Sequence, residues 1–257
     1  VEERGFQLNT NAKNLKQQRS NCIAAVVKGT SNEMFATLVE RLQALFASAA
    51  HPLIVDFIDE DDNEVKRAVQ LCLERKPMGL MFLGANNCNF LADFDKIQIP
   101  TVVVTNDASH LPFENLSSVT TDDCKGAACA VEYLLKAGHR SIAVIGGDRS
   151  ISDTSALRCR GCMVPFDETR MYHTGRYNYE SGYTGMQEIL KNTPEVTAVF
   201  AMADVIAIGA IRAACDAGKR VPEDISVIGY DGLKVGDYYC PPLRSRWTVS
   251  RCAALRS

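Results

Sequence analysis

The sequence has no long hydrophobic run and no recognisable leader. No apolar stretch in the 257-residue chain approaches the roughly 18–20 residues that a membrane-spanning helix needs. Residues 1–20 are polar and contain no apolar core of a signal peptide, so nothing in them marks the chain for secretion. We therefore expect a cytoplasmic protein without a membrane segment.

Several arrangements that carry chemistry are also missing. The ten cysteines follow no framework spacing, which favours a reducing compartment over a disulfide scaffold. Cys159 and Cys162 could form a redox pair or half a zinc site, but no second cysteine pair completes such a site and the four histidines are isolated. No glycine-rich phosphate loop follows a strand, and no Gly-x-Ser-x-Gly turn marks a hydrolase. The sequence predicts no metal, no cofactor and no enzymatic activity.

A strong excess of one charge is absent as well. The net charge is −3, which argues against a nucleic-acid surface over the whole chain, since duplex binding needs a local basic patch. Residues 1–20 leave room for such a patch, because they contain Arg4, Lys13, Lys16 and Arg19. Composition alone describes this segment as a solvated leader.

The sequence does contain a regular alternation of short apolar runs and amphipathic stretches. This pattern is typical of parallel α/β sheets with crossover helices. The predicted strands are 23–27, 52–57, 79–83, 101–104 and 141–146. The predicted helices are one through Phe35, Leu38, Leu42 and Leu45, then 63–75 and 124–137. We expect one sheet lobe up to about residue 118 and a second after it.

The clearest unit of this kind runs from Val196 to Gly232. A buried strand from Ala198 to Ala203 is followed by a helix with apolar residues at helical spacing, and then by a strand over 225–228. Asp204 and Asp231 each come just after a strand of this βαβ unit. Ligands of open α/β sheets bind outside the carboxyl ends of the strands, so the two acids are expected to face a small ligand.

The same region closely resembles a known family. The run AIGAIRAACDAGKRVPEDISVIGYDG is similar to the effector-binding region of LacI/GalR-type bacterial transcription regulators, and the likeness continues through IPTVVVTN, VTTDDCKGA and LLKAGHRSIAVIGG. The resemblance implies a periplasmic-binding-protein type I fold with two Rossmann-like parallel-sheet lobes. It also implies an effector in the cleft between the lobes and a homodimer that uses helices such as 35–45 and 205–217.

The N-terminal segment GFQLNTNAKNLKQQRS also resembles a part of this family, the hinge between the DNA-binding headpiece and the effector domain. By that resemblance the hinge residues are Asn9, Ala12, Lys13 and Leu15, with Lys13 where arginine is usual. Leu15 would be the apolar wedge that enters the minor groove of operator DNA. We expect residues 1–20 to be a hinge to an absent helix-turn-helix headpiece, 21–118 the N-terminal lobe and 119–244 the C-terminal lobe.

Two places depart from the family pattern. Only residues 162–174 separate Gly161 from Gly175, they lack helical periodicity, and Pro165 interrupts them. The chain also ends soon after Leu243, so that 245–257 form an incomplete return segment. Our hypothesis is that segments of the protein are missing at both places, which an intact mass different from 28.2 kDa would show.

The resemblance assigns an effector site to the following residues: Arg158, Asp231, Asp204, Tyr177, Asn106, Phe35, Asn32 and Met34. Arg158, in SALRCRGC, would donate to paired hydroxyls or to a carboxylate, with a surface arginine as the alternative. Asp231 would accept from hydroxyls or ring nitrogens, and the alternative is that it caps the following helix. For Asp204 there are two alternatives: it contacts the effector, or it caps the helix that it begins.

The remaining site residues carry similar alternatives. Tyr177 would stack on the effector ring or be a core aromatic. Asn32, Met34 and Phe35 would wall the pocket, although Phe35 could be the first core residue of its helix. Asn106 stands where the family frequently has Asp-Arg, so at this position the effector would meet a neutral side chain and not a charged one. This set of polar and aromatic residues suits a sugar or polyol, and a nucleobase remains open.

The sequence thus indicates the effector-binding and dimerisation part of a repressor that controls operator DNA. A periplasmic-type solute-binding protein for sugar uptake is the alternative, but it would need a signal peptide and no basic hinge. A more distant alternative is an α/β enzyme that uses Asp204, Asp231 or Cys162.

Overall fold

The computed structural model describes residues 20–29, 32–162 and 172–245. The predicted hinge residues Asn9, Ala12, Lys13 and Leu15 lie outside these residues, as do most of 162–174 and of the return segment. The chain divides into two compact units. The described part of the first covers 20–28 and 38–119, and that of the second covers 29, 32–37, 120–162 and 172–245.

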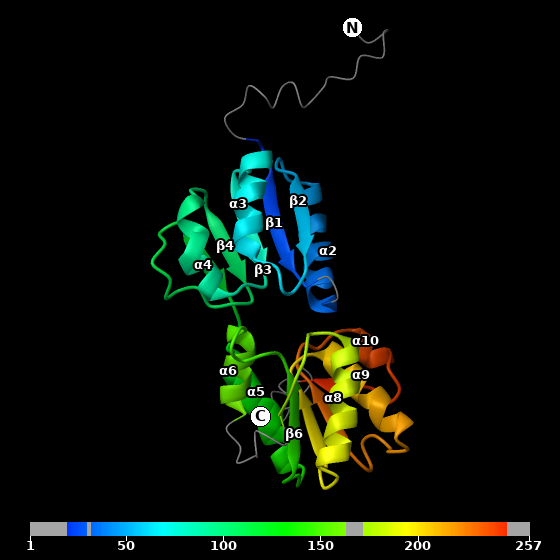
Figure 1. Ribbon diagram of the computed structural model, residues 1–257. Helices are drawn as coiled ribbons and strands as arrows, with labels where there is room; N and C mark the ends of the chain where they lie inside the picture. The colour runs from blue at the N-terminus through cyan, green and yellow to red at the C-terminus, as the bar shows by residue number, and fades with distance from the viewer. Residues whose placement is uncertain (1–19, 30–31, 163–171, 246–257) are drawn as a thin grey trace, which may run out of the picture. The chain divides into compact units, whose positions relative to one another are not determined.

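The first unit is built on a five-stranded sheet with strand order β2-β1-β3-β4-β5. All neighbouring strands are parallel. Its elements are β1 (Ile23–Lys28), most of α2 (Glu33–Ala47), β2 (Leu53–Ile58), α3 (Glu64–Arg75), β3 (Gly79–Leu83), α4 (Asn87–Asp93), η2 (Phe94–Lys96), β4 (Thr101–Val104) and β5 (Leu116–Val119) (Figure 1). The first residues of α2, 33–37, fall in the second unit. Its core includes the buried ring of Phe90, which contacts the buried rings of Phe82 and Phe94.

The second unit is built on another parallel five-stranded sheet, with strand order β10-β9-β8-β6-β7. Its elements are α5 (Asp123–Lys136), β6 (Ile142–Gly146), α6 (Asp153–Gly161), β7 (Tyr172–Thr174), α8 (Tyr179–Asn192), β8 (Ala198–Ala201), α9 (Asp204–Asp216), β9 (Ser226–Gly229), α10 (Val235–Tyr238) and β10 (Arg244–Ser245). Strands β6 and β8 are buried along their whole length. This explains why they read as continuous apolar runs rather than alternating ones.

The helices begin where local chemistry places them. Asn63 caps α3 by accepting from the backbone N–H of Lys66, and Asn178 caps α8 in the same way from Ser181. Each cap satisfies a backbone donor that the first helical turn leaves free. Within the described residues, no helix is long and apolar enough to cross a membrane.

The predicted fold class of two parallel-sheet α/β lobes is confirmed, and each strand and helix predicted from periodicity is present with its ends shifted by a few residues at most. The structure adds elements that we did not predict, among them α4, α6, α8, β5 and β10. Part of segment 162–174 forms the strand β7 beside β6. Helix α9 is more buried than an amphipathic surface helix, since ten of its residues are buried.

Candidate functional site

Arg158 lies on α6 and is almost completely buried, with 6% of its surface exposed. Its Nε–H donates to Asp123 Oδ1 over 2.9 Å, and its Nη1 donates to the backbone carbonyl of Met202. Its guanidinium lies 3.6 Å above the ring of Tyr230. Burial opposes the charge, but the negative groups around it raise the pKa of Arg158 above its ordinary value, so it stays a cation.

Asp123 and Tyr230 hold this arginine, and neither was among the site residues predicted from the sequence. Asp123 is the first residue of α5, and only 2% of its surface is exposed. The hydroxyl of Tyr230 donates to the same Oδ1 atom that Arg158 uses, over 2.8 Å. Both residues stand inside stretches that resemble the family, VTTDDCKGA and GYDG. No local pattern signals their contact, because Asp123 and Tyr230 are 107 residues apart.

Asp204 anchors a loop rather than capping α9. The N-cap of α9 is Ala203, which makes no side-chain capping bond. The buried carboxylate of Asp204 instead accepts from the backbone N–H groups of Tyr230, Asp231 and Leu233, at 2.8, 3.1 and 2.7 Å. These bonds fix the segment that follows β9, and therefore the position of Asp231. The capping alternative for Asp204 is wrong, because its carboxylate is used by the loop.

Asp231 is half-buried and accepts from the first backbone N–H of α9, that of Asp204, over 3.0 Å. It therefore completes the start of the preceding helix, and not of the following helix α10, whose first turn has no side-chain cap. Burial raises the pKa of Asp231 to about 6, Arg158 opposes this rise, and Asp204 reinforces it.

Tyr177 lies at the same edge of the sheet. Its hydroxyl shares a 2.9 Å hydrogen bond with Ser155 Oγ, and its ring lies against Gly147, just beyond β6. Burial raises the pKa of this hydroxyl, so it stays a neutral donor and acceptor. The structure thus brings Arg158, Asp231 and Tyr177 together at the carboxyl ends of the strands, and Asp204 is joined to Asp231 through its backbone N–H.

Of the other four predicted site residues, Asn106 belongs to the first unit, whereas Asn32, Met34 and Phe35 stand at the start of α2 and fall in the second unit. Asn106 follows β4 and is locked to Ala85, whose backbone N–H it accepts from at 3.2 Å and whose carbonyl it donates to at 2.9 Å. Asn32 Oδ1 accepts from the backbone N–H of Met34 over 3.0 Å, and this bond lies at the start of α2. Phe35 is buried and Met34 half-buried. Thr105, next to Asn106, has a φ of 82°, a left-handed conformation that costs a β-branched residue on the order of 1–3 kcal/mol.

Metal or thiol chemistry finds little support in the part of the chain that the structure describes. There, no group of three or more His, Cys, Asp or Glu residues could hold a metal ion. Cys159 and Cys162 are both buried, and burial raises the pKa of the Cys162 thiol, which makes it a poor nucleophile.

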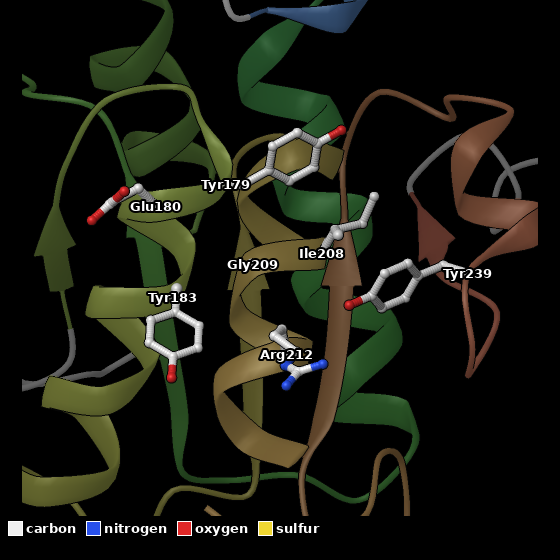
Figure 2. Close-up of a pocket in the computed structure, with 7 residues that line it drawn as sticks. All are labelled: Tyr179, Glu180, Tyr183, Ile208, Gly209, Arg212 and Tyr239. Carbon is white, nitrogen blue, oxygen red and sulfur yellow. The ribbon is translucent and has the colours of Figure 1, made fainter. Parts of the chain in front are cut away.

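A separate pocket of ≈ 390 Å³ lies on the outer face of α8 and α9. It is lined by Tyr179, Glu180, Tyr183, Ile208, Gly209, Arg212 and Tyr239. Figure 2 shows Arg212 between the rings of Tyr183 and Tyr239, with Tyr179 at the other end of the group, beyond Ile208 and Gly209. None of the predicted effector residues lines this pocket.

Comparison with known proteins identifies the family. Residues 131–250 match the family described as "Periplasmic binding protein-like domain". The HTH-type transcriptional regulator DegA of Bacillus subtilis (strain 168) is 30% identical over 255 residues, which cover 95% of this chain and 74% of the relative. The chain belongs to the LacI/GalR family of transcriptional regulators. The HTH-type transcriptional regulator MalR of Clostridium butyricum is a further relative, 28% identical over 95% of this chain and 75% of its own length.

Solved structures of LacI/GalR regulators share the fold. A complex of the regulator CelR with cellobiose has a TM-score of 0.76 at 25% identity and covers 98% of this chain and 84% of its own. The lac repressor dimer bound to operator and an anti-inducer has a TM-score of 0.78 at 22% identity, with 98% and 92% covered. The relatives are transcriptional regulators, so this LacI/GalR chain is a ligand-responsive regulator and not a solute-binding protein for uptake.

Proposed function

We propose that this chain is the effector-binding and dimerisation part of a LacI/GalR repressor, and that its effector is a small sugar or polyol. The observation that carries the proposal is the meeting of Arg158, Asp231 and Tyr177 at the strand ends. Together they supply a cationic fork of donors, an acceptor whose pKa is about 6, and an aromatic hydroxyl. Such a set suits neighbouring hydroxyl groups on a ring. The cellobiose bound to CelR is consistent with this class of ligand, and a nucleobase is the second class to test.

The other proposed effector contacts are Asn106, which belongs to the first unit, and Asn32, Met34 and Phe35, which fall in the second unit. Asn106 keeps its amide in place through its two bonds to Ala85, so it contributes a fixed, uncharged contact. The strained backbone at Thr105 supports a functional role for this loop, because such strain collects at ligand sites.

The effector acts by a population shift. It binds one arrangement of the two lobes more tightly than the other and can change operator affinity only by that difference. The basic hinge with Asn9, Ala12, Lys13 and Leu15 transmits the change to DNA, with Leu15 as the minor-groove wedge. A headpiece outside this sequence reads the operator, and the protein works in the cytoplasm, where its operator is.

The homodimer uses the outer face of α8 and α9. The pocket there collects three tyrosines and an arginine, residue types that are enriched where proteins meet. Helix α9 is one of the two helices that the family resemblance assigned to the dimer, and α2 is the other. Helix α9 directs Arg212, Cys215 and Asp216 outward while its other faces are buried in its own unit.

A thermal-shift screen of sugars, polyols and nucleobases tests the effector site. A ligand at 100 times its dissociation constant adds about 2.7 kcal/mol to the free energy of unfolding. Arg158→Ala and Asp231→Asn should each lose this gain, whereas Arg220→Ala, at an exposed arginine of the β8–β9 connection, should keep it. Arg158→Ala leaves the Asp123 carboxylate buried without its cation, so this variant can fail to fold. In that case the ligand affinity of Asp231→Asn decides the test. Ligand binding that is unchanged in Asp231→Asn and in a folded Arg158→Ala would refute the site.

A further inference from the structure

The arginine of the effector site is not a free cation. Asp123, with 2% of its surface exposed, takes the Nε–H of Arg158 at 2.9 Å in a buried ion pair. Tyr230 adds a 2.8 Å hydrogen bond to the same carboxylate oxygen, and its ring covers the guanidinium. The backbone carbonyl of Met202 accepts a hydrogen bond from Nη1 of Arg158. The guanidinium is therefore fixed in place and electrically balanced before any ligand arrives.

The balance of charge around Arg158 is negative. Asp123 and Asp231 both face this one guanidinium, and Asp204 lies next to Asp231. A desolvated anionic ligand would meet a cation that is already neutralised and a second carboxylate beside it. Repulsion between like charges a few ångströms apart is strong in a partly buried site. A neutral hydroxyl group meets no such penalty, because it can donate to Asp231 and accept from the remaining Arg158 donors.

We propose that Asp123 sets the charge selectivity of the effector site, so that the site accepts uncharged, hydroxyl-bearing effectors and rejects sugar acids and sugar phosphates. This inference rests on the proposed function, because it concerns the same site. It adds a residue that neither touches the ligand nor stood among the expected effector contacts. Asp123 acts through Arg158, and it is a positioning and charge-balancing residue.

The test uses inorganic phosphate and gluconate as probes, titrated at constant ionic strength near pH 7.5 and followed by calorimetry. Wild-type protein should bind both anions weakly. Asp123→Asn keeps the shape of the side chain but removes the charge, so it should bind phosphate tighter by on the order of tenfold. The double variant Asp123→Asn with Arg158→Gln should lose this gain, because the anion is held by the arginine.

Asp122→Asn is the matched control, since it makes the same change of charge one residue earlier. Asp122 is the exposed N-cap of α5, bonds to the N–H of Lys125 and does not contact Arg158. Asparagine caps helices as well as aspartate does, so this variant should fold and bind phosphate like the wild type. Equal phosphate affinity in Asp123→Asn, Asp122→Asn and the wild type would overturn the proposal.

Two further measurements keep the result decisive. If Asp123→Asn does not fold, Asp123→Asn with Tyr230→Phe removes the same charge together with the hydroxyl that bonded to it, and it should show the same gain. Wild-type protein that binds gluconate as tightly as glucose would also overturn charge selectivity. The phosphate result needs no natural effector, so a neutral-ligand screen without a hit would count against the proposed function and not against Asp123.

Discussion

Three carboxylates of the second unit, those of Asp123, Asp204 and Asp231, make different contacts. Asp204 accepts three backbone N–H groups and fixes the loop after β9. Asp123 balances Arg158. Asp231 accepts from the N–H of Asp204, and burial raises its pKa to about 6. Burying a carboxylate is costly unless it is paired or hydrogen-bonded, and each of the three is.

The raised pKa of Asp231 predicts a pH-dependent stability. Its folded-state pKa is about 6 and its ordinary value is 3.8, so between these values the folded protein holds a proton that the unfolded chain has lost. The contribution of Asp231 to the free energy of unfolding is therefore lost as the pH rises from about 4 to 6. Asparagine does not titrate, so the Asp231→Asn variant does not lose stability for this reason as the pH rises. Relative to wild type, its stability should increase by about 2 kcal/mol over that window, after allowance for the half-exposed side chain.

Urea unfolding of both proteins between pH 4 and 7 measures this difference. Asp224→Asn is the control of opposite sign, because Arg220 lowers the pKa of Asp224. A difference between wild type and Asp231→Asn that does not vary with pH would contradict the prediction.

Helices α8 and α9 pack closely because each has a glycine where it meets the other. Gly182 on α8 and Gly209 on α9 let the two helices approach so closely that a Cβ on either would overlap a backbone carbonyl of the other helix, that of Ile206 or of Tyr179. This close contact orients α9, whose first residue is Asp204, and Gly209 also lines the tyrosine pocket. Glycine is otherwise a poor helix residue, so the packing must outweigh its cost.

Replacing Gly209 by alanine should therefore destabilise the protein. In an open helix the change would gain about 1 kcal/mol. Here the overlap with the Tyr179 carbonyl should force the helices apart and lower the free energy of unfolding by about 2 kcal/mol or more. Gly236→Ala in α10 is the control, because its Cβ would lie 3.3 Å from a Leu243 side-chain atom and the fit needs only a small adjustment. Thermal unfolding of both variants checks this, and equal melting temperatures would contradict it.

At the scale of the whole molecule, the sequence folds twice into the same plan of a five-stranded parallel sheet with helices. This plan puts the polar residues of each sheet at the carboxyl ends of its strands, as is general for open α/β sheets. None of the residues that line the pocket on α8 and α9 is among the predicted effector residues. Ligand recognition and assembly can therefore use different surfaces of one unit.

The proposed dimer predicts that Arg212→Glu weakens self-association. Arg212 borders the tyrosine pocket, is 67% exposed and pairs with Asp216 at 2.9 Å. Reversing its charge places two like charges on the face and should raise the dimer dissociation constant at least about tenfold. Sedimentation velocity measures this change. Arg220→Glu, an equal reversal at an exposed residue outside the pocket, should leave the dimer intact, and an unchanged dimer in Arg212→Glu would assign the interface elsewhere.

The sequence by itself determined the class of fold, its two sheet lobes and the family. These follow from periodicity and from the long run around GYDG, because buried parallel strands and crossover helices leave a local pattern in the residues. The same run placed Asp204 and Asp231 at strand ends, and Arg158 came from the family likeness of SALRCRGC.

Only the tertiary structure decided what those side chains touch. Arg158 meets Asp123 across 35 residues and Met202 across 44, and Asp123 meets Tyr230 across 107. Such pairings depend on how helices pack on a sheet, and a local pattern does not contain them. For the same reason the sequence could not show that Asp204 serves a loop, that Asp231 serves α9, or that two glycines bring α8 and α9 together.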